Sequence, residues 1–411
     1  MAHRGIPPRL LRRALLILVN ALNSVLVPLL SPLISLAVVR LAGSGVWGEF
    51  VGALILVQLG AHVIAWGNKE YLLRLFSFNP ARIAHAWQSS LVTRLPLLAI
   101  LAAIFALAGS SSQRWVMLTL WSLGLVVYQS FDVVVLYKRD FVFATVVELA
   151  GLGLALAAIL RLGAHVDLDG LIVLFGVTSW LKVTTMAARF RHPFLSDAFG
   201  RLRVRERFDA RFFREAFPFF VLGLSGLLQS RIDLYTANYF LPPGEVAQYQ
   251  VLATFVLLLQ SLSNFVLAPF AKNIYRIQMQ SILGLSSRLL ALGAMAALPG
   301  LLVTQAIVGV HYGFDLPPGA FVMGGIAALP VFFYLPIVYA LYKVGAQSVV
   351  VKINLIGIGV SFVLSAALLP RAGLTGAAAA AAAGQCCMGI VYSMQGRSLR
   401  ADHAIAMPDL S

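Results

Sequence analysis

Arg231 lies within an apolar run, Phe217 to Phe240, that is long enough to cross a bilayer and contains one other charged residue, Asp233. A span needs about 20 residues at about 1.5 Å each, so Arg231 is expected about 5 Å from the midplane. A guanidinium at that depth costs about 3 kcal/mol or more unless it faces protein or water. Its planar fork of donors suits phosphate oxygens, which indicates a site for an anionic, phosphorylated substrate. An ion pair with an acid on a neighbouring span is the alternative, and Asp233 points to a different helix face.

A second group of ionisable residues occurs in the N-terminal half, at similar depth on different predicted spans: His62, Asp132, Glu148 and Lys182. We expect them to converge, either as a neutralised salt-bridge network or as a site that couples transport to protons or sodium. Asp233 is a further candidate for ion coupling. The sequence has no phosphate-binding Gly-rich loop and no His or Cys residues at metal-ligand spacing. We therefore expect no catalytic site, no metal and no cofactor.

The elements that must position these residues are membrane spans. The chain of 411 residues is 60% hydrophobic and only 11% charged, unlike a soluble globular protein. Its net charge of +15 is scattered between apolar runs, so membrane topology explains it better than nucleic-acid binding. The two cysteines, Cys386 and Cys387, are adjacent, which argues against a structural disulfide. The fold class expected is all-α, a polytopic inner-membrane protein.

Apolar runs bounded by charges predict about 12 transmembrane helices in two six-helix lobes around a central cavity. The expected spans are Leu15 to Val39, Val46 to Trp66, Leu95 to Gly109, Trp115 to Tyr137, Phe141 to Leu160, Gly170 to Ala187, Phe217 to Phe240, Ala247 to Phe270, Leu289 to Val310, Ala320 to Tyr342, Ile353 to Leu369 and Gly373 to Met394. With both termini in the cytoplasm, 25 of the 31 lysines and arginines fall in cytoplasmic segments, as the positive-inside rule requires.

The expected organisation is an N-terminal lobe (1–187), a basic cytoplasmic linker (188–216), a C-terminal lobe (217–396) and a cytoplasmic tail (397–411). The linker contains eight arginines interleaved with phenylalanines, a composition that suits a segment lying on an anionic leaflet. Such a segment serves either as a tether between the lobes or to recruit a charged substrate. Leu41 to Leu59 is similar to Tyr239 to Leu259 at an offset of 199. This repeat indicates two lobes related by an axis along the membrane normal.

Three segments together resemble a known family: RLAGSGVWGEF with AWGNKEYLLR (Ala65 to Arg74), FPFFVLGLSGLLQSRIDLYTANYFLPPGEVAQYQ (Phe217 to Gln250), and LPRAGLTGAAAAAAAG (Leu369 to Gly384). They are similar to the Wzx-type polysaccharide biosynthesis flippases of the multidrug/oligosaccharidyl-lipid/polysaccharide exporter superfamily. The chain departs from the family pattern at Asn68, Lys69 and the Pro242–Pro243 turn.

This resemblance implies a flippase in the bacterial inner membrane that moves undecaprenyl-diphosphate-linked oligosaccharide units from the cytoplasmic to the periplasmic leaflet by alternating access. The product would be O-antigen, capsule or exopolysaccharide. Arg231 would bind the diphosphate, with Arg40, Lys69 and Arg74 as helpers, although each helper could instead anchor its span at the interface. Polar stripes on the first and seventh spans suit sugar hydroxyls or interhelical hydrogen bonds: Asn20, Asn23, Ser24, Ser225, Gln229 and Ser230.

The partners implied are the lipid-linked glycan, membrane lipids, a polysaccharide polymerase and a chain-length regulator. An ion-coupled exporter of small organic cations from the same superfamily is the alternative function, because it would use acidic groups such as Asp132, Glu148 and Asp233. A membrane-embedded glycosyltransferase would need a large soluble loop with catalytic carboxylates. The longest expected outer loop, Arg161 to Gly170, is too short for that.

Overall fold

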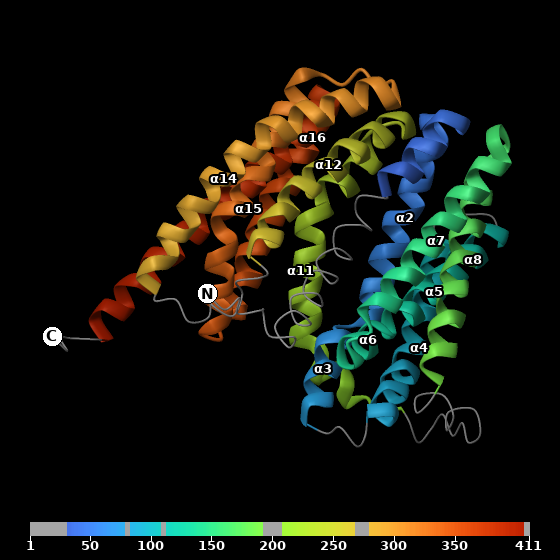
Figure 1. Cartoon of the computed structure of the whole chain (residues 1–411), viewed down its shortest axis with the longest axis horizontal. Helices are drawn as coiled ribbons and strands as arrows, with labels where there is room; N and C mark the ends of the chain where they lie inside the picture. The colour runs from blue at the N-terminus through green and yellow to red at the C-terminus, as the bar shows by residue number, and fades with distance from the viewer. Residues whose placement is uncertain (1–30, 79–82, 108–111, 192–207, 268–278, 407–411) are drawn as a thin grey trace, which may run out of the picture. The chain divides into compact units, whose positions relative to one another are not determined.

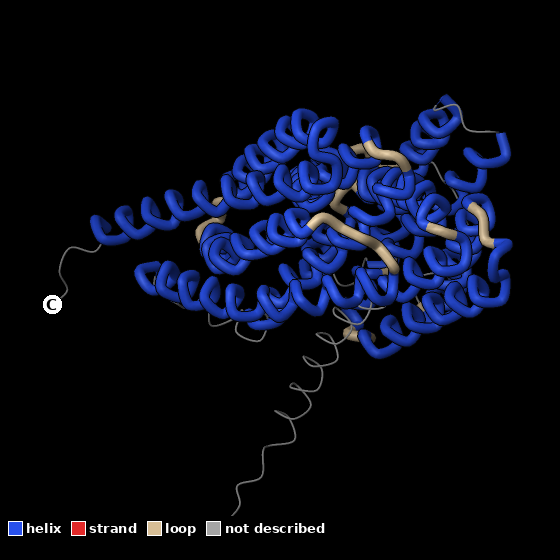
Figure 2. The backbone as a smooth tube through the Cα atoms, turned by 90° about the horizontal axis from the view of Figure 1, so that it is seen from above, coloured by secondary structure: helices blue, strands red, loops and turns tan. Residues whose placement is uncertain are grey.

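The computed structural model describes residues 31–78, 83–107, 112–191, 208–267 and 279–406. Every regular element in these ranges is a helix, and Figure 2 shows helices joined by short loops. Nine helical stretches of the described chain are long and apolar enough to cross a membrane. Another long helix, α11 (Arg211–Phe240, 30 residues), contains the expected seventh span but is not among these nine. These helices follow the order predicted from the apolar runs, and the all-α polytopic fold is confirmed.

The chain divides into two compact units. Unit 1 consists of residues 1–42 and 52–224, and unit 2 of residues 43–51 and 225–411. Two continuous helices, α2 (Ser44–Ala65) and α11, therefore contribute one part to each unit. The lobe boundaries expected from the sequence stay a prediction.

Unit 1 contains the last part of α2, the first part of α11 and a set of helices that Figure 1 labels in order: α3 (Asn68–Phe78), α4 (Ile83–Leu107), α5 (Ser112–Ser130), α6 (Asp132–Lys138), α7 (Phe141–Leu162) and α8 (Leu168–Arg189). The core of unit 1 contains side chains from each of the helices α3 through α8, among them Phe76, Trp87 and Phe131. Of the first expected span, only residues 31–39 lie within the described residues, and they belong to the helix Ser31–Ala42.

Unit 2 contains the first turns of α2, α11 from Ser225 onward and four further elements: α12 (Pro243–Leu267), α14 (Met279–Ala306) with a π-helical end (Ile307–Tyr312), α15 (Pro318–Lys343) and α16 (Gln347–Ala406). Helix α15 packs against α12, α14 and α16. The backbone of α16 is interrupted at Gly373, whose φ of 51° and ψ of −132° are not helical, so its two halves correspond to the last two expected spans.

The third expected span, Leu95 to Gly109, begins too late. Helix α4 starts at Ile83, twelve residues earlier, and Gln88, Thr93 and Arg94 are buried within unit 1. From the sequence alone these polar residues are assigned to a loop, because a span is recognised there by its apolar residues. In the fold they face protein instead of lipid, which lets the helix continue through them.

The repeat predicted at an offset of 199 coincides with two helix starts, because α2 begins at Ser44 and α12 at Pro243. Within unit 2 the first turns of these helices pack together. The indole N–H of Trp47 donates to Oε1 of Gln250 at 2.9 Å. Gly48 approaches the carbonyl of Pro243 so closely that a Cβ would overlap it.

Candidate functional site

Arg231 lies in the part of α11 that belongs to unit 2 and is half-buried. Neither the ion pairs nor the hydrogen bonds of the described residues include its side chain, so no acidic partner on another described helix neutralises it. A guanidinium has five N–H donors and cannot be deprotonated under ordinary conditions. The described residues use none of these donors, and Asp233, two residues along the same helix, attracts the guanidinium electrostatically.

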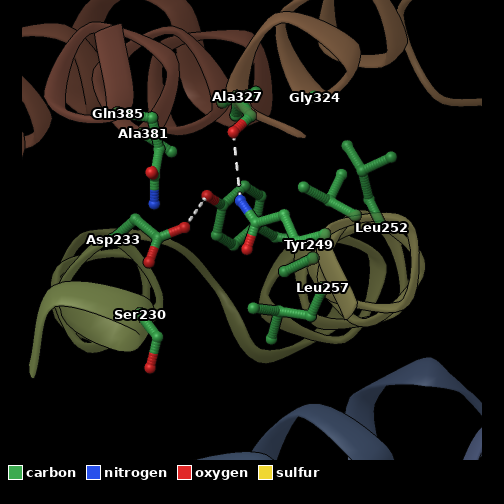
Figure 3. Close-up of a pocket in the computed structure, with 13 residues that line it drawn as sticks. Ser230, Asp233, Tyr249, Leu252, Leu257, Gly324, Ala327, Ala381 and Gln385 are labelled. Carbon is green, nitrogen blue, oxygen red and sulfur yellow. Dashed lines mark hydrogen bonds between the residues drawn. The ribbon is translucent and has the colours of Figure 1, made fainter. Parts of the chain in front are cut away.

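Asp233 lies two residues further along α11 and lines a small pocket of about 40 Å³ within unit 2 (Figure 3). The hydroxyl of Tyr249, from α12, donates to Oδ2 of Asp233. Four helices supply the remaining lining, which is mostly apolar and includes Leu252, Gly324 and Ala381. Asp233 is the one charged side chain among the lining residues.

Two amide side chains complete the polar part of this pocket. Nε2 of Gln260 donates to the carbonyl of Ala327 at 3.0 Å, and Oε1 of Gln385 accepts from the hydroxyl of Tyr334 at 3.0 Å. Each amide is held by one of its two polar atoms, so Oε1 of Gln260 and Nε2 of Gln385 remain for other partners. A single carboxylate among hydroxyl and amide groups suits a proton or a hard cation better than a phosphate. The described residues contain no group of three or more metal-ligating side chains.

The N-terminal cluster forms two ion pairs. Nζ of Lys182 lies 2.6 Å from Oε2 of Glu148, and this ammonium is 5.3 Å from the centre of the Tyr128 ring. Nζ of Lys69 lies 3.6 Å from Oδ2 of Asp132. Both carboxylates of the predicted cluster therefore have a lysine partner. One of these lysines, Lys69, is also a candidate for binding the diphosphate.

His62 lies apart from these ion pairs, next to Gly223. Its buried Nε2 has no hydrogen-bond partner among the described residues. It therefore joins neither ion pair, although the sequence placed it at a similar depth.

The other predicted site residues occupy varied positions. Arg40 and Arg74 are exposed on the first helix and on α3, and both belong to unit 1. Ser230 lines the pocket and donates to the carbonyl of Leu227 at 2.9 Å, and Gln229 is half-buried beside it. The sugar-contact candidates on the first span, Asn20, Asn23 and Ser24, lie outside the described residues.

Arg94 is the ionisable residue that the sequence analysis missed. Its side chain is 1% exposed and is surrounded by neutral acceptors instead of a carboxylate. Nε donates to the carbonyl of Ser90 at 3.0 Å, Nη2 to the hydroxyl of Ser130 at 2.9 Å and Nη1 to the carbonyl of Ala65 at 3.5 Å. Arg94 thus ties α4 to the ends of α2 and α5. The run of Ser, Thr and Arg before Leu95 is its one sequence signal.

Neither protein-family models nor curated proteins match the sequence. Solved structures do. The lipid II flippase MurJ, in an inward closed conformation, is similar with a TM-score of 0.68 at 12% identity, over 95% of this chain and 94% of that one. The eukaryotic MATE transporter AtDTX14 is similar with a TM-score of 0.54 at 12% identity, over 95% of this chain and 99% of that one. An inward-facing multidrug resistance MATE family transporter of the MOP superfamily has a TM-score of 0.51 at 14% identity, over 91% and 95%.

The chain has the fold of the MOP transporters. The likeness to MurJ and to MATE proteins shows that the chain shares the multi-pass helical fold of these structures. The solved structures named here are a flippase and transporters. The narrower Wzx-type resemblance stays a prediction. The MOP fold accommodates both lipid flippases and drug exporters, so the choice between these functions depends on the side chains described above.

Proposed function

We propose that this MOP-fold protein is a flippase for undecaprenyl-diphosphate-linked oligosaccharides in the bacterial inner membrane, with both termini in the cytoplasm. It would carry repeat units to the periplasmic leaflet for surface polysaccharide synthesis. The substrate has a diphosphate and sugars that must pass the hydrocarbon region while the isoprenoid tail stays in lipid. A permanent cation within a span is what such a substrate requires.

The proposal rests on Arg231, a cation that forms no close ion pair with the described residues. A guanidinium in a membrane span without an acidic partner is costly, and such residues are usually retained for a ligand or an ion pathway. No carboxylate of the described residues forms a close ion pair with Arg231, and Asp233 on the same helix attracts it without direct contact. A diphosphate would supply the missing acceptors through bidentate, charge-assisted hydrogen bonds.

For the coupling ion we propose Asp233. Asp132 and Glu148 each have a lysine partner, whereas the side chain of Asp233 has a hydroxyl partner and faces a pocket. A carboxylate in such a place can exchange a proton or bind a cation during the transport cycle. The same feature supports the second candidate function, export of a small organic cation, because an acidic pocket also suits that substrate.

Substitution of Arg231 tests the proposal. Arg231→Ala removes charge and donors, so we expect surface glycan to fall at least about tenfold and lipid-linked precursor to accumulate in the inner leaflet, as the loss of charged hydrogen bonds predicts. Arg231→Lys keeps the charge and loses the planar fork, so we expect partial activity. Surface glycan should be measured against the amount of membrane-inserted protein.

Arg288→Ala is the matched control, because Arg288 is an exposed arginine of α14 in the same unit. It should export glycan as the parent does. Normal glycan export by well-expressed Arg231→Ala protein would refute the diphosphate site. Efflux of an organic cation by that same variant, lost in Asp233→Asn, would favour the exporter.

A further inference from the structure

A groove of about 200 Å³ lies on the exposed face of α7 and α8, which pack side by side in unit 1 (Figure 1). Its walls include Val146, Leu154 and Leu181, which are 56%, 48% and 46% exposed. Both helices are long and apolar enough to cross a membrane, so an apolar face of this kind contacts lipid. This face is hollow, whereas a simple lipid-facing helix pair would be filled by its own side chains.

Small residues and an ion pair form the hollow. Ala150 and Gly151 line it on α7, and a Cβ at Gly151 would overlap Cε of Lys182. Lys182 lines the groove from α8 and is held by Glu148. From Phe143 to Leu154 the lined part of α7 is about 16 Å long at about 1.5 Å per residue. That length suits part of one straight hydrocarbon chain.

Four cationic residues gather where the groove ends at the start of α7 and the end of α8: Lys138, Arg139, Arg189 and Arg191. Arg189 joins this basic cluster to the groove, because its Nη2 lies 2.9 Å from Oδ2 of Asp140 and its guanidinium lies 5.4 Å from the ring centre of Phe143, a groove residue. The other three are exposed and have no ion pair with a described residue. Among the described residues, Asp140 is thus the one carboxylate that forms an ion pair with any of these four cations, and it binds Arg189.

We propose that this face binds an anionic glycerophospholipid, with its phosphate at Arg139 and Arg191 and one acyl chain in the α7–α8 groove. An apolar groove that ends in a cluster of positive charge is complementary to an amphiphile with an anionic head group. The basic cluster lies at the predicted cytoplasmic end of both helices, where anionic lipids are enriched. The site lies wholly in unit 1 and does not depend on which substrate the protein transports.

Lipid retention by the purified full-length chain tests the site. Native mass spectrometry of protein from nanodiscs containing equal amounts of phosphatidylglycerol and phosphatidylcholine should show preferential retention of phosphatidylglycerol. Arg139→Gln combined with Arg191→Gln should weaken this preference by about 25-fold, because each basic residue near an anionic lipid contributes about fivefold. Ala150→Trp, which fills the groove and leaves the charges in place, should also abolish retention.

Two matched variants control for general effects. Arg161→Gln removes one exposed arginine at the opposite end of α7, and Ala157→Trp adds bulk at an exposed alanine of α7 outside the groove. Both should retain phosphatidylglycerol as the parent does. Equal retention of the two lipids by the parent, or an equal loss in Arg161→Gln, would overturn the proposal. So would displacement of phosphatidylglycerol from the parent by undecaprenyl phosphate, because the groove would then belong to an isoprenoid.

Discussion

At the scale of residues, three carboxylates within membrane helices differ in their partners. Glu148 forms a close ion pair with Lys182, and these side chains are 21% and 17% exposed. Asp132 pairs at longer range with Lys69, and both of these are nearly half exposed. Asp233 accepts a hydrogen bond from Tyr249 in a pocket. A shielded ion pair holds helices together, whereas Asp233 has no directly bonded cation and only the electrostatic attraction of Arg231, so it can change its ligand.

We therefore predict opposite effects for two neutralising substitutions. Asp233→Asn should alter the proton or sodium dependence of transport with little change in the amount of folded protein. Glu148→Gln should leave that dependence unchanged and lower stability by about 2 kcal/mol, between the values for exposed and for buried ion pairs, because Lys182 loses its partner. Transport assays at varied pH and sodium, with thermal unfolding in detergent, measure both.

Lys182→Met in the Glu148→Gln background is the control for the ion pair, since it removes the unpaired ammonium and should restore most of the lost stability. Asp132→Asn should cost less than about 1 kcal/mol because its ion pair is more exposed. A changed ion dependence in Glu148→Gln, together with an unchanged one in Asp233→Asn, would move the coupling site to the N-terminal cluster.

Sequence reasoning singled out Arg231 and Asp233 as candidates but not the residues around them. Arg231 and Asp233 stand out because an isolated charge in an apolar run has a large energetic cost. Gln260 and Gln385 do not stand out, because uncharged amides are common in spans and only the packing of α12 and α16 brings them to Asp233. Arg94 was missed because a buried arginine at a span edge resembles an interfacial one.

At the scale of elements, apolar runs predicted the order of the helices well because lipid forces every backbone group in a span into a helix. Helix ends were predicted less well. Helix α11 begins at Arg211, where Asp209 accepts a hydrogen bond from the backbone N–H of Arg211 at 3.0 Å, six residues before the expected start at Phe217. Hydropathy marks where lipid contact ends, whereas capping marks where the helix ends.

The contact between α2 and α12 gives a prediction at this scale. Gly48→Ala places a methyl group against the Pro243 carbonyl, and backbone cannot move aside as a flexible side chain can. We expect a loss of about 1–3 kcal/mol, as for overpacking of a well-packed core. Thermal unfolding of the purified protein measures this loss.

Gly45→Ala is the control, because a Cβ at Gly45 meets no atom within 4 Å and alanine is the better helix former. It should be neutral or slightly stabilising. Equal stability of the Gly45→Ala and Gly48→Ala proteins would mean that the two helix starts do not touch as described.

At the scale of the whole molecule, the two units exchange parts of two helices, since α2 and α11 each cross from one unit to the other. Motion of one unit must therefore be transmitted along these helices or absorbed within them. Arg231 lies on α11 only six residues beyond Ser225, where that helix enters unit 2. Its ligand would consequently act on an element that both units share.

The orientation of the chain in the membrane can be tested at the two ends of the helix pair α7 and α8. The Arg189–Asp140 ion pair holds the end of α8 beside the start of α7, so the turn at 163–167 lies at the other end of both helices. Reporter fusions within 188–216 and after residue 400 should read cytoplasmic, because basic residues are retained on that side, and a fusion at 163–167 should read periplasmic. Reversal of all three signals would keep the fold and invert the direction of transport. The same signal at 163–167 and within 188–216 would be incompatible with α8 as a membrane span.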